Sequence, residues 1–139
     1  MTGVTRTKMT TSGRTKMNNS LSDLYESQIA NQCKMLNLGM YDRFTKFIGR
    51  KPPYDDVSLS SYHIQQLMSE IGEVLDADKR WKNFRNEKYD KAAKVEELAD
   101  CFIVLMNVCM YSGVTGEELE RAISNKIEEV SIRIDDIAE

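Results

Sequence analysis

The chain has 139 residues, which suits a single domain, and its 41% hydrophobic and 29% charged residues are typical of a soluble globular protein. Its 19 basic and 22 acidic residues give a net charge of −3, so we expect no specific nucleic-acid partner. Because the sequence has neither a long apolar span nor a secretion signal, we expect a cytoplasmic protein with no membrane partner.

Residues 1–20 differ from the rest of the chain because they carry four basic residues, no acidic residue and no apolar face. This composition predicts a flexible basic tail ahead of one all-α domain at residues 21–139. Three interpretations of the tail stay open: a nucleic-acid-binding arm, an organelle transit peptide, or an extension ahead of a start at Met17. We favour the extension.

Two long helices are expected in the first half of the domain. Apolar residues at helical spacing predict the first from about Ser22 to Asn37, and a short helical piece at about 41–48 follows it. A Gly-Arg-Lys-Pro-Pro break ends this piece. The second long helix is predicted to start near 58–61 and to reach Arg80. Its expected core face is the apolar stripe of Ile64, Leu67, Met68, Ile71, Val74 and Leu75.

Two further helices are expected after a polar connection at 82–91. The third is predicted from about Lys91 to Tyr111, with Asp90 as its N-cap. Its expected core face comprises Val95, Leu98, Phe102, Leu105 and Cys109. The fourth starts at a T-x-x-E capping box at 115–118 and keeps a helical apolar spacing to its end. With no convincing strand, the elements predict an all-α, up-down bundle of four to five helices.

Two pairs of carboxylates lie on neighbouring helices. Glu70 and Glu73 are on the second helix and Glu97 and Asp100 on the third, and each pair projects from one side of its helix. The 23 residues between Glu73 and Glu97 allow the helices to run antiparallel with the pairs facing each other. A divalent cation would relieve the repulsion of four carboxylates, and oxygen ligands favour Mg²⁺ or Mn²⁺. The residues alone also allow the pairs to be ordinary solvated charge.

The acidic face of the third helix becomes apolar one and two turns after Asp100, at Val104, Val108 and Tyr111. A face of this kind is not simply solvated. It predicts carboxylates at the mouth of a cleft, with the rest of the face covered by another helix or subunit.

Several other classes of catalytic site are excluded by residues and motifs that the sequence lacks. His63 is the only histidine, which excludes a histidine-rich zinc site. We expect it to be a surface or partly buried structural residue, and a contact to a base is the alternative. The three cysteines form no C-x-x-C pair and fit a reducing cytosol. The glycine motifs of P-loop and Rossmann proteins are absent from the sequence. Any catalysis therefore depends on carboxylates.

The segments Glu70-Ile-Gly-Glu73 and Glu97-Leu-Ala-Asp100 resemble the E-x-x-E … E-x-x-D signature of the all-α nucleoside triphosphate pyrophosphohydrolases, such as the MazG-like enzymes and dimeric dUTPases. The similarity covers roughly residues 62–133. It implies a MazG-like helical fold, a homo-oligomer (dimer or tetramer) and Mg²⁺-dependent hydrolysis of a (d)NTP to a (d)NMP and pyrophosphate. It also implies that the four carboxylates are the catalytic metal ligands.

Candidates for substrate binding lie outside this signature. Lys79 and Trp81 follow the second helix, where a cation can meet phosphate oxygens and an indole can stack on a base. A solvated helix end is an equally weighted interpretation. Lys126 and Arg133 resemble phosphate-contacting positions of MazG-like enzymes, although pairing with acidic neighbours such as Glu129 also explains them.

The sequence therefore predicts a Mg²⁺-dependent nucleotide pyrophosphohydrolase. The alternatives are a phosphoribosyl-ATP pyrophosphohydrolase-like enzyme and a non-catalytic helical interaction protein. Ten of the eleven residues at 101–111 are apolar, so the third helix presents apolar side chains all round and we expect a second copy to cover it. The tandem Trp-rich segment of some relatives is missing, and a pyrimidine preference rests on family analogy alone.

Overall fold

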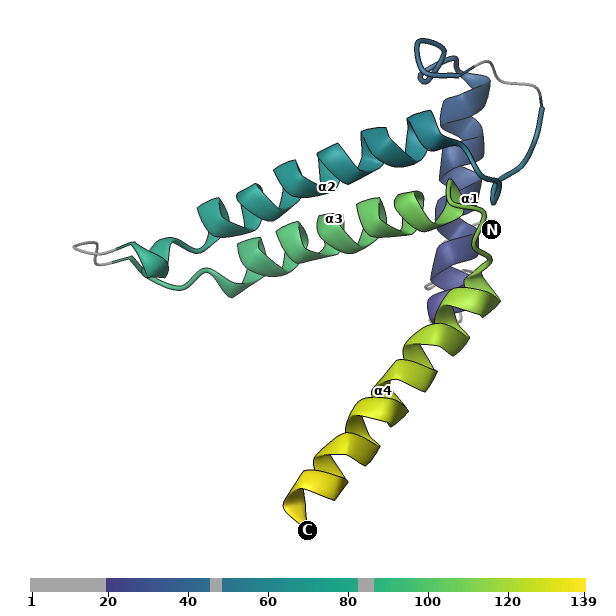
Figure 1. Cartoon of the computed structure of the whole chain (residues 1–139). Helices are drawn as coiled ribbons and strands as arrows, with labels where there is room; N and C mark the ends of the chain where they lie inside the picture. Colours follow the sequence, from purple (N-terminus) through teal and green to yellow (C-terminus); the bar gives the residue numbers. More distant parts are fainter. Residues whose placement is uncertain (1–19, 46–48, 83–86) are drawn as a thin grey trace, which may run out of the picture.

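The computed structural model describes residues 20–45, 49–82 and 87–139 (Figure 1). These residues form four helices, and a short 3₁₀ turn at Lys79–Trp81 follows the second. The helices are α1 (Leu21–Asn37), α2 (Val57–Ala77), α3 (Lys91–Met110) and α4 (Gly116–Ala138). The described part of the chain is thus all-α and has no strand, although Asp55 and Ser112 form one isolated bridge.

Two sequence predictions fall wholly or partly outside these ranges. The basic tail expected at 1–20 lies outside them except for Ser20, which is the N-cap of α1. The helical piece expected at 41–48 also lies partly outside them, and its described residues 41–44 form turns. None of the helices in the described ranges combines the length and the apolar composition that a membrane span needs.

The ends of the helices follow the capping chemistry of the sequence. The Asp90 carboxylate accepts a hydrogen bond from Ala93 N, which confirms the predicted N-cap of α3. Thr115 and Glu118 bond each other's backbone N–H groups, which confirms the capping box of α4. The helix α2 stops at Ala77 instead of Arg80 because Asp78 adopts an extended backbone (φ −131°, ψ 96°).

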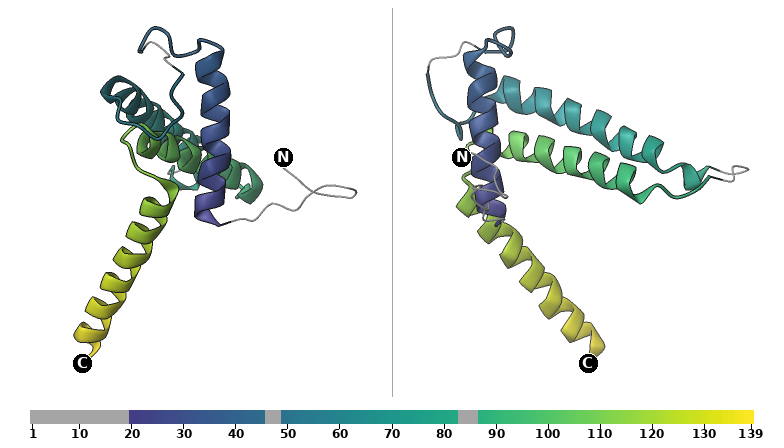
Figure 2. Two further views of the ribbon diagram at one scale, coloured as in Figure 1. Left: turned by 90° about the vertical axis from the view of Figure 1, so that its right-hand side faces the viewer. Right: turned by 180° about the vertical axis from the view of Figure 1, so that it is seen from behind.

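The helices α2 and α3 run antiparallel, side by side, and make the most extensive contact between helices in the described chain (Figures 1 and 2). The helix α1 lies across one end of this pair, and α4 leads away from it. The first turn of α4 is fixed to the start of α1, where Ser22 N donates to the Glu120 carboxylate at 2.9 Å. The described residues of one chain therefore do not close into the expected up-down bundle.

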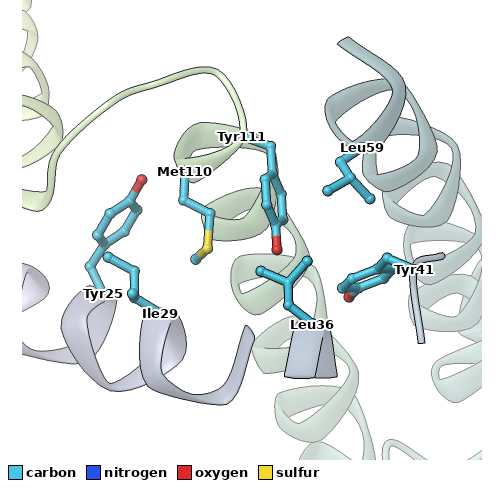
Figure 3. Close-up of a cluster of buried hydrophobic side chains, with 7 residues drawn as sticks. All are labelled: Tyr25, Ile29, Leu36, Tyr41, Leu59, Met110 and Tyr111. Atoms are coloured by element: carbon cyan, nitrogen blue, oxygen red, sulfur yellow. The ribbon is translucent and has the colours of Figure 1, made fainter. Parts of the chain in front are cut away.

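The buried core lies where α1 meets the ends of α2 and α3 (Figure 3). Its residues are all at most 4% exposed, and they are Tyr25, Ile29, Leu36, Tyr41, Leu59, Met110 and Tyr111. Backbone bonds join the entry of α2 to the exit of α3 here, from Tyr54 N to Met110 O at 2.9 Å and from Asp56 N to Tyr111 O at 2.8 Å. This core fixes the base of the α2–α3 pair.

The core faces expected on α2 and α3 are wrong for the single chain. Met68 remains 69% exposed and Phe102 65% exposed, and most of both predicted stripes is similarly open. The face of α3 that changes from acidic to apolar is instead the covered one, since Val104 and Tyr111 are buried. The two helices thus pack through their mixed polar faces, which leaves their most apolar faces outside.

Candidate functional site

The antiparallel packing of α2 and α3 brings the two acidic pairs together. Glu70 and Glu97 are half-buried, whereas Glu73 and Asp100 are exposed. Burial raises the pKa of Glu70, and the nearby charges of Glu73 and Asp100 raise it further. Burial also raises the pKa of Glu97. The charges of Glu73, Asp100 and Glu70 raise it further, as does a side-chain hydrogen bond with Glu73. The four carboxyl groups are therefore close enough to repel one another, which is the juxtaposition expected from their spacing.

Two oxygens of this cluster lack a partner. Glu70 Oε2 and Glu97 Oε2 are buried, and neither has a hydrogen-bond partner in the described part of the chain. An unsatisfied buried polar atom is unfavourable by roughly 1–3 kcal/mol, and a charged one by more. Carboxylate oxygens are the donors that Mg²⁺ and Mn²⁺ prefer, so the donor chemistry of the cluster fits a hard divalent cation.

The cluster is not arranged as a finished cation cage. Across residues 20–45, 49–82 and 87–139, no three His, Cys, Asp or Glu side chains are placed so that they could hold one metal ion. The donors fit a cation, but binding one requires the carboxyl groups to come closer together than they are in this structure.

A cavity of about 290 Å³ opens between α1, α2 and α3, and Glu70 and Asp100 line it. Its remaining polar lining comprises Gln28, Gln32, Tyr41, Tyr62, His63, Gln66 and Asn107. Three of these, Gln32, His63 and Asn107, are at most 4% exposed as residues. Glu70 and Asp100 thus lie at a polar cavity, as expected for carboxylates at a cleft, whereas Glu73 and Glu97 are not among its lining residues.

His63 is buried, not a surface or partly buried residue as expected, because α2 turns it into the core beside Tyr111. The two rings stack at 5.5 Å with an interplanar angle of 3°. Burial lowers the pKa of His63, which keeps the imidazole neutral. Its Nδ1 lies 3.2 Å from Gln66 Oε1, and its Nε2 is buried with no partner among the described residues.

Lys79 and Trp81 lie beyond the end of α2, away from this cavity. The Trp81 indole N–H donates to Leu75 O at 3.0 Å, and the side chain is 57% exposed. Trp81 lines a separate pocket of about 450 Å³ beside Asp78, Arg80 and Lys94. The Asp78 carboxylate pairs with both of these cations, at 2.7 Å and 3.0 Å. The structure therefore does not bring Trp81 or Lys79 to the carboxylate cluster.

Lys126 and Arg133 lie on α4, which diverges from α2 and α3 (Figure 1). Both residues are exposed, and Lys126 Nζ lies 3.5 Å from Glu129 Oε1. The alternative expected for these two cations was pairing with an acidic neighbour such as Glu129. Glu129 pairs with Lys126 and not with Arg133. Within one chain, α4 does not carry them to the carboxylates.

Sequence reasoning missed the amides that line the cavity. Gln28 and Gln32 come from α1, far from the acidic signature in sequence, and no local pattern marks them. Asn107 carries a signal in hindsight, because it is the one polar residue among the eleven at 101–111.

Comparisons with known proteins identify no relative of this chain. No protein-family model, no characterised protein and no solved structure matches the chain.

Proposed function

We propose that the chain is a Mg²⁺-dependent nucleoside triphosphate pyrophosphohydrolase with a MazG-like arrangement of α2 and α3. The observation that carries the proposal is the meeting of Glu70, Glu73, Glu97 and Asp100 across two helices, with two buried, unpartnered carboxylate oxygens among them. An acidic cluster on an ordinary solvated face would leave these oxygens in water. The resemblance to the E-x-x-E … E-x-x-D signature supports the same assignment.

The four carboxylates would hold one or two Mg²⁺ ions, and Mn²⁺ is an acceptable substitute. When bound there, the cation would neutralise phosphate charge and lower the pKa of a bound water molecule. The carboxyl groups of Glu73 and Asp100 are exposed, so one of them can accept a proton from the attacking water. Water oxygen then bonds to phosphorus, a phosphoanhydride bond breaks, and pyrophosphate leaves the monophosphate.

We also propose that the working form is a homo-oligomer. The outward faces of α2 and α3 expose apolar side chains to an extent unusual for a protein that functions as a monomer. A methyl group at Gly72 would have no atom within 4 Å in the described chain, which leaves room on α2 for another copy. In such an assembly, the α4 of a second copy is the element able to bring Lys126 and Arg133 to the phosphates.

Product analysis tests the proposed reaction. Each dNTP and NTP is incubated with the protein and Mg²⁺, and the products are separated by chromatography. Monophosphate with pyrophosphate is the expected result. Diphosphate with orthophosphate contradicts the proposal, and turnover of phosphoribosyl-ATP alone identifies that alternative. Absence of turnover with every nucleotide favours a non-catalytic interaction protein.

A further inference from the structure

Basic residues are concentrated at the end of the α2–α3 pair that lies farthest from α1 (Figure 1). Residues 78–94 hold seven basic and three acidic residues, whereas the remainder of the domain at 21–139 holds eight basic and 19 acidic residues. The net charge of −3 therefore averages over a positive end and a negative body. We call the described residues of this end, 78–82 and 87–94, the basic tip.

Two cations of the basic tip are paired inside the protein, and four are not. The Asp78 carboxylate binds Arg80 at 2.7 Å and Lys94 at 3.0 Å, and Asp78 is only 8% exposed. The other four basic residues form no ion pair with a described residue, and they are Lys79, Lys82, Lys88 and Lys91. All four are at least partly exposed, so their charges are available to an anion from outside the chain.

Two exposed aromatic rings lie among these cations. Trp81 is 57% exposed and Tyr89 is 45% exposed. The Trp81 indole N–H donates to Leu75 O at 3.0 Å, so its polar atom is already used and the ring is left to offer its π surface. The Arg80 guanidinium lies 3.7 Å from the centre of the Tyr89 ring, and Lys82 Nζ lies 5.4 Å from the centre of the Trp81 ring. Cations beside exposed rings are the combination that holds single-stranded nucleic acid, because phosphates meet the cations and bases stack on the rings.

The pocket of about 450 Å³ at the basic tip has the lining that a stacked base needs. Val74 and Leu75 supply apolar surface, Trp81 supplies an aromatic ring, and the paired cations lie beside them. An acidic protein segment brings carboxylates but no flat ring for this pocket. An anionic membrane also fits less well, since the hydrogen bond to Leu75 O holds the Trp81 ring against α2 instead of leaving it free to insert among lipids.

We propose that the basic tip binds single-stranded nucleic acid without sequence preference. The four unpaired lysines contact phosphates of the strand, and a base stacks on Trp81 in the pocket. Stacking selects no particular base, because every base has a π-face. This surface is separate from the carboxylate cluster and needs neither a triphosphate nor a metal, so the inference goes beyond the proposed hydrolysis and does not depend on it.

Fluorescence tests the inference directly, because Trp81 is the only tryptophan in the chain. An oligothymidylate without a terminal phosphate is titrated into the full chain in the presence of EDTA. We expect quenching of Trp81 with a dissociation constant of about 1–100 µM, the usual range for non-specific binding. With four lysine–phosphate contacts, the logarithm of the binding constant should fall with the logarithm of the salt concentration at a slope of about −3. Absence of binding in this concentration range overturns the inference.

Lysine variants test the phosphate contacts. Lys88→Gln combined with Lys91→Gln removes two exposed cations and should reduce the steepness of the salt dependence by about 1.4. Lys34→Gln combined with Lys51→Gln is the matched control, since both lysines are exposed outside the basic tip and their removal should leave this slope unchanged. Equal slopes in the two double variants contradict the assignment.

Two variants of Trp81 test the stacking, with binding followed by the fluorescence polarisation of a labelled oligothymidylate. Trp81→Leu keeps an apolar side chain but removes the ring, and it should weaken binding about tenfold. Trp81→Phe keeps a ring and should retain most of the affinity. Equal affinities of the two variants contradict the stacking on which the choice of nucleic acid rests.

Other polyanions distinguish nucleic acid from other classes of partner. Poly-glutamate and vesicles of phosphatidylserine and phosphatidylcholine are titrated in the same buffer, and both should bind more weakly than the oligothymidylate. Equal or tighter binding of either one overturns the inference and identifies an acidic protein or a membrane as the partner. Oligothymidylate binding that every variant of the basic tip leaves unchanged would assign the binding to the basic residues at 1–19, which also overturns the inference.

Discussion

The buried hydrogen bond from Tyr111 to Gln32 joins the core to the cavity, and its removal has a predictable effect. Tyr111 is 0% exposed and Gln32 1% exposed, and the two oxygens are 2.7 Å apart. Burial raises the pKa of Tyr111, so the hydroxyl keeps the proton that it donates. Tyr111→Phe keeps the ring that stacks on His63 and deletes only the donor, which leaves Gln32 Oε1 buried and unsatisfied.

The expected loss follows from this geometry. Leaving a neutral acceptor buried without a partner lowers the free energy of unfolding by roughly 1–3 kcal/mol. For a chain of this length, the melting temperature should fall by roughly 3–12 °C.

Chemical and thermal denaturation followed by circular dichroism measures this loss. Tyr62→Phe is the matched control, because the Tyr62 ring packs on Phe44 but its hydroxyl has no hydrogen-bond partner among the described residues. That control should change the free energy of unfolding by no more than about 0.5 kcal/mol. A Tyr111→Phe protein as stable as the Tyr62→Phe protein would refute the reasoning that the buried bond holds Gln32 in place.

Three further predictions concern pH, the far end of the α2–α3 pair, and assembly. Burial lowers the pKa of His63, so the unfolded chain binds a proton on this histidine more readily than the folded chain does. The free energy of unfolding should therefore be highest above about pH 7 and decline as the pH falls through about 6.5. Denaturation of His63→Phe should show a flatter pH profile. Hydrogen bonds from Arg80 and Lys94 hold the pKa of Asp78 well below its usual range. The ionised carboxylate therefore stabilises the folded chain above about pH 4, and this contribution is lost in acid. Asp78→Asn should lower the melting temperature at neutral pH and weaken the loss of stability in acid. Phe102→Lys places a charge on the exposed face of α3 and should convert the proposed oligomer to a monomer in sedimentation experiments. A wild-type protein that is already monomeric at micromolar concentration contradicts the proposed assembly.

The existence of the four helices and the N-caps of α3 and α4 were predictable because their signals are local, whereas the end of α2 was placed three residues too late. Asp90 and Thr115 act through atoms three residues away, so the sequence alone is enough to identify both caps. The antiparallel approach of Glu73 and Glu97 was also accessible, since helix spacing and the length of the connection nearly determine it.

Which face of each helix packs within the chain was not predictable in the same way. Periodicity groups Ile64, Met68 and Ile71 on one side of α2, but it does not say whether that side meets α3 or the outside. The sequence could not predict the cavity for a related reason. Gln28 and Asn107 are 79 residues apart, and only the crossing of α1 over the α2–α3 pair brings their amides to 3.0 Å.

Direct titration with Mn²⁺, followed by electron paramagnetic resonance, tests the carboxylate site most directly. The wild-type protein should bind Mn²⁺, and Mg²⁺ should compete for the site. Glu73→Gln and Asp100→Asn should each weaken binding at least tenfold while keeping the helical content. Glu96→Gln, next to Glu97 but on an exposed side of α3, should bind like the wild type. A wild-type protein that binds no Mn²⁺, or equal binding in all four proteins, would contradict the account.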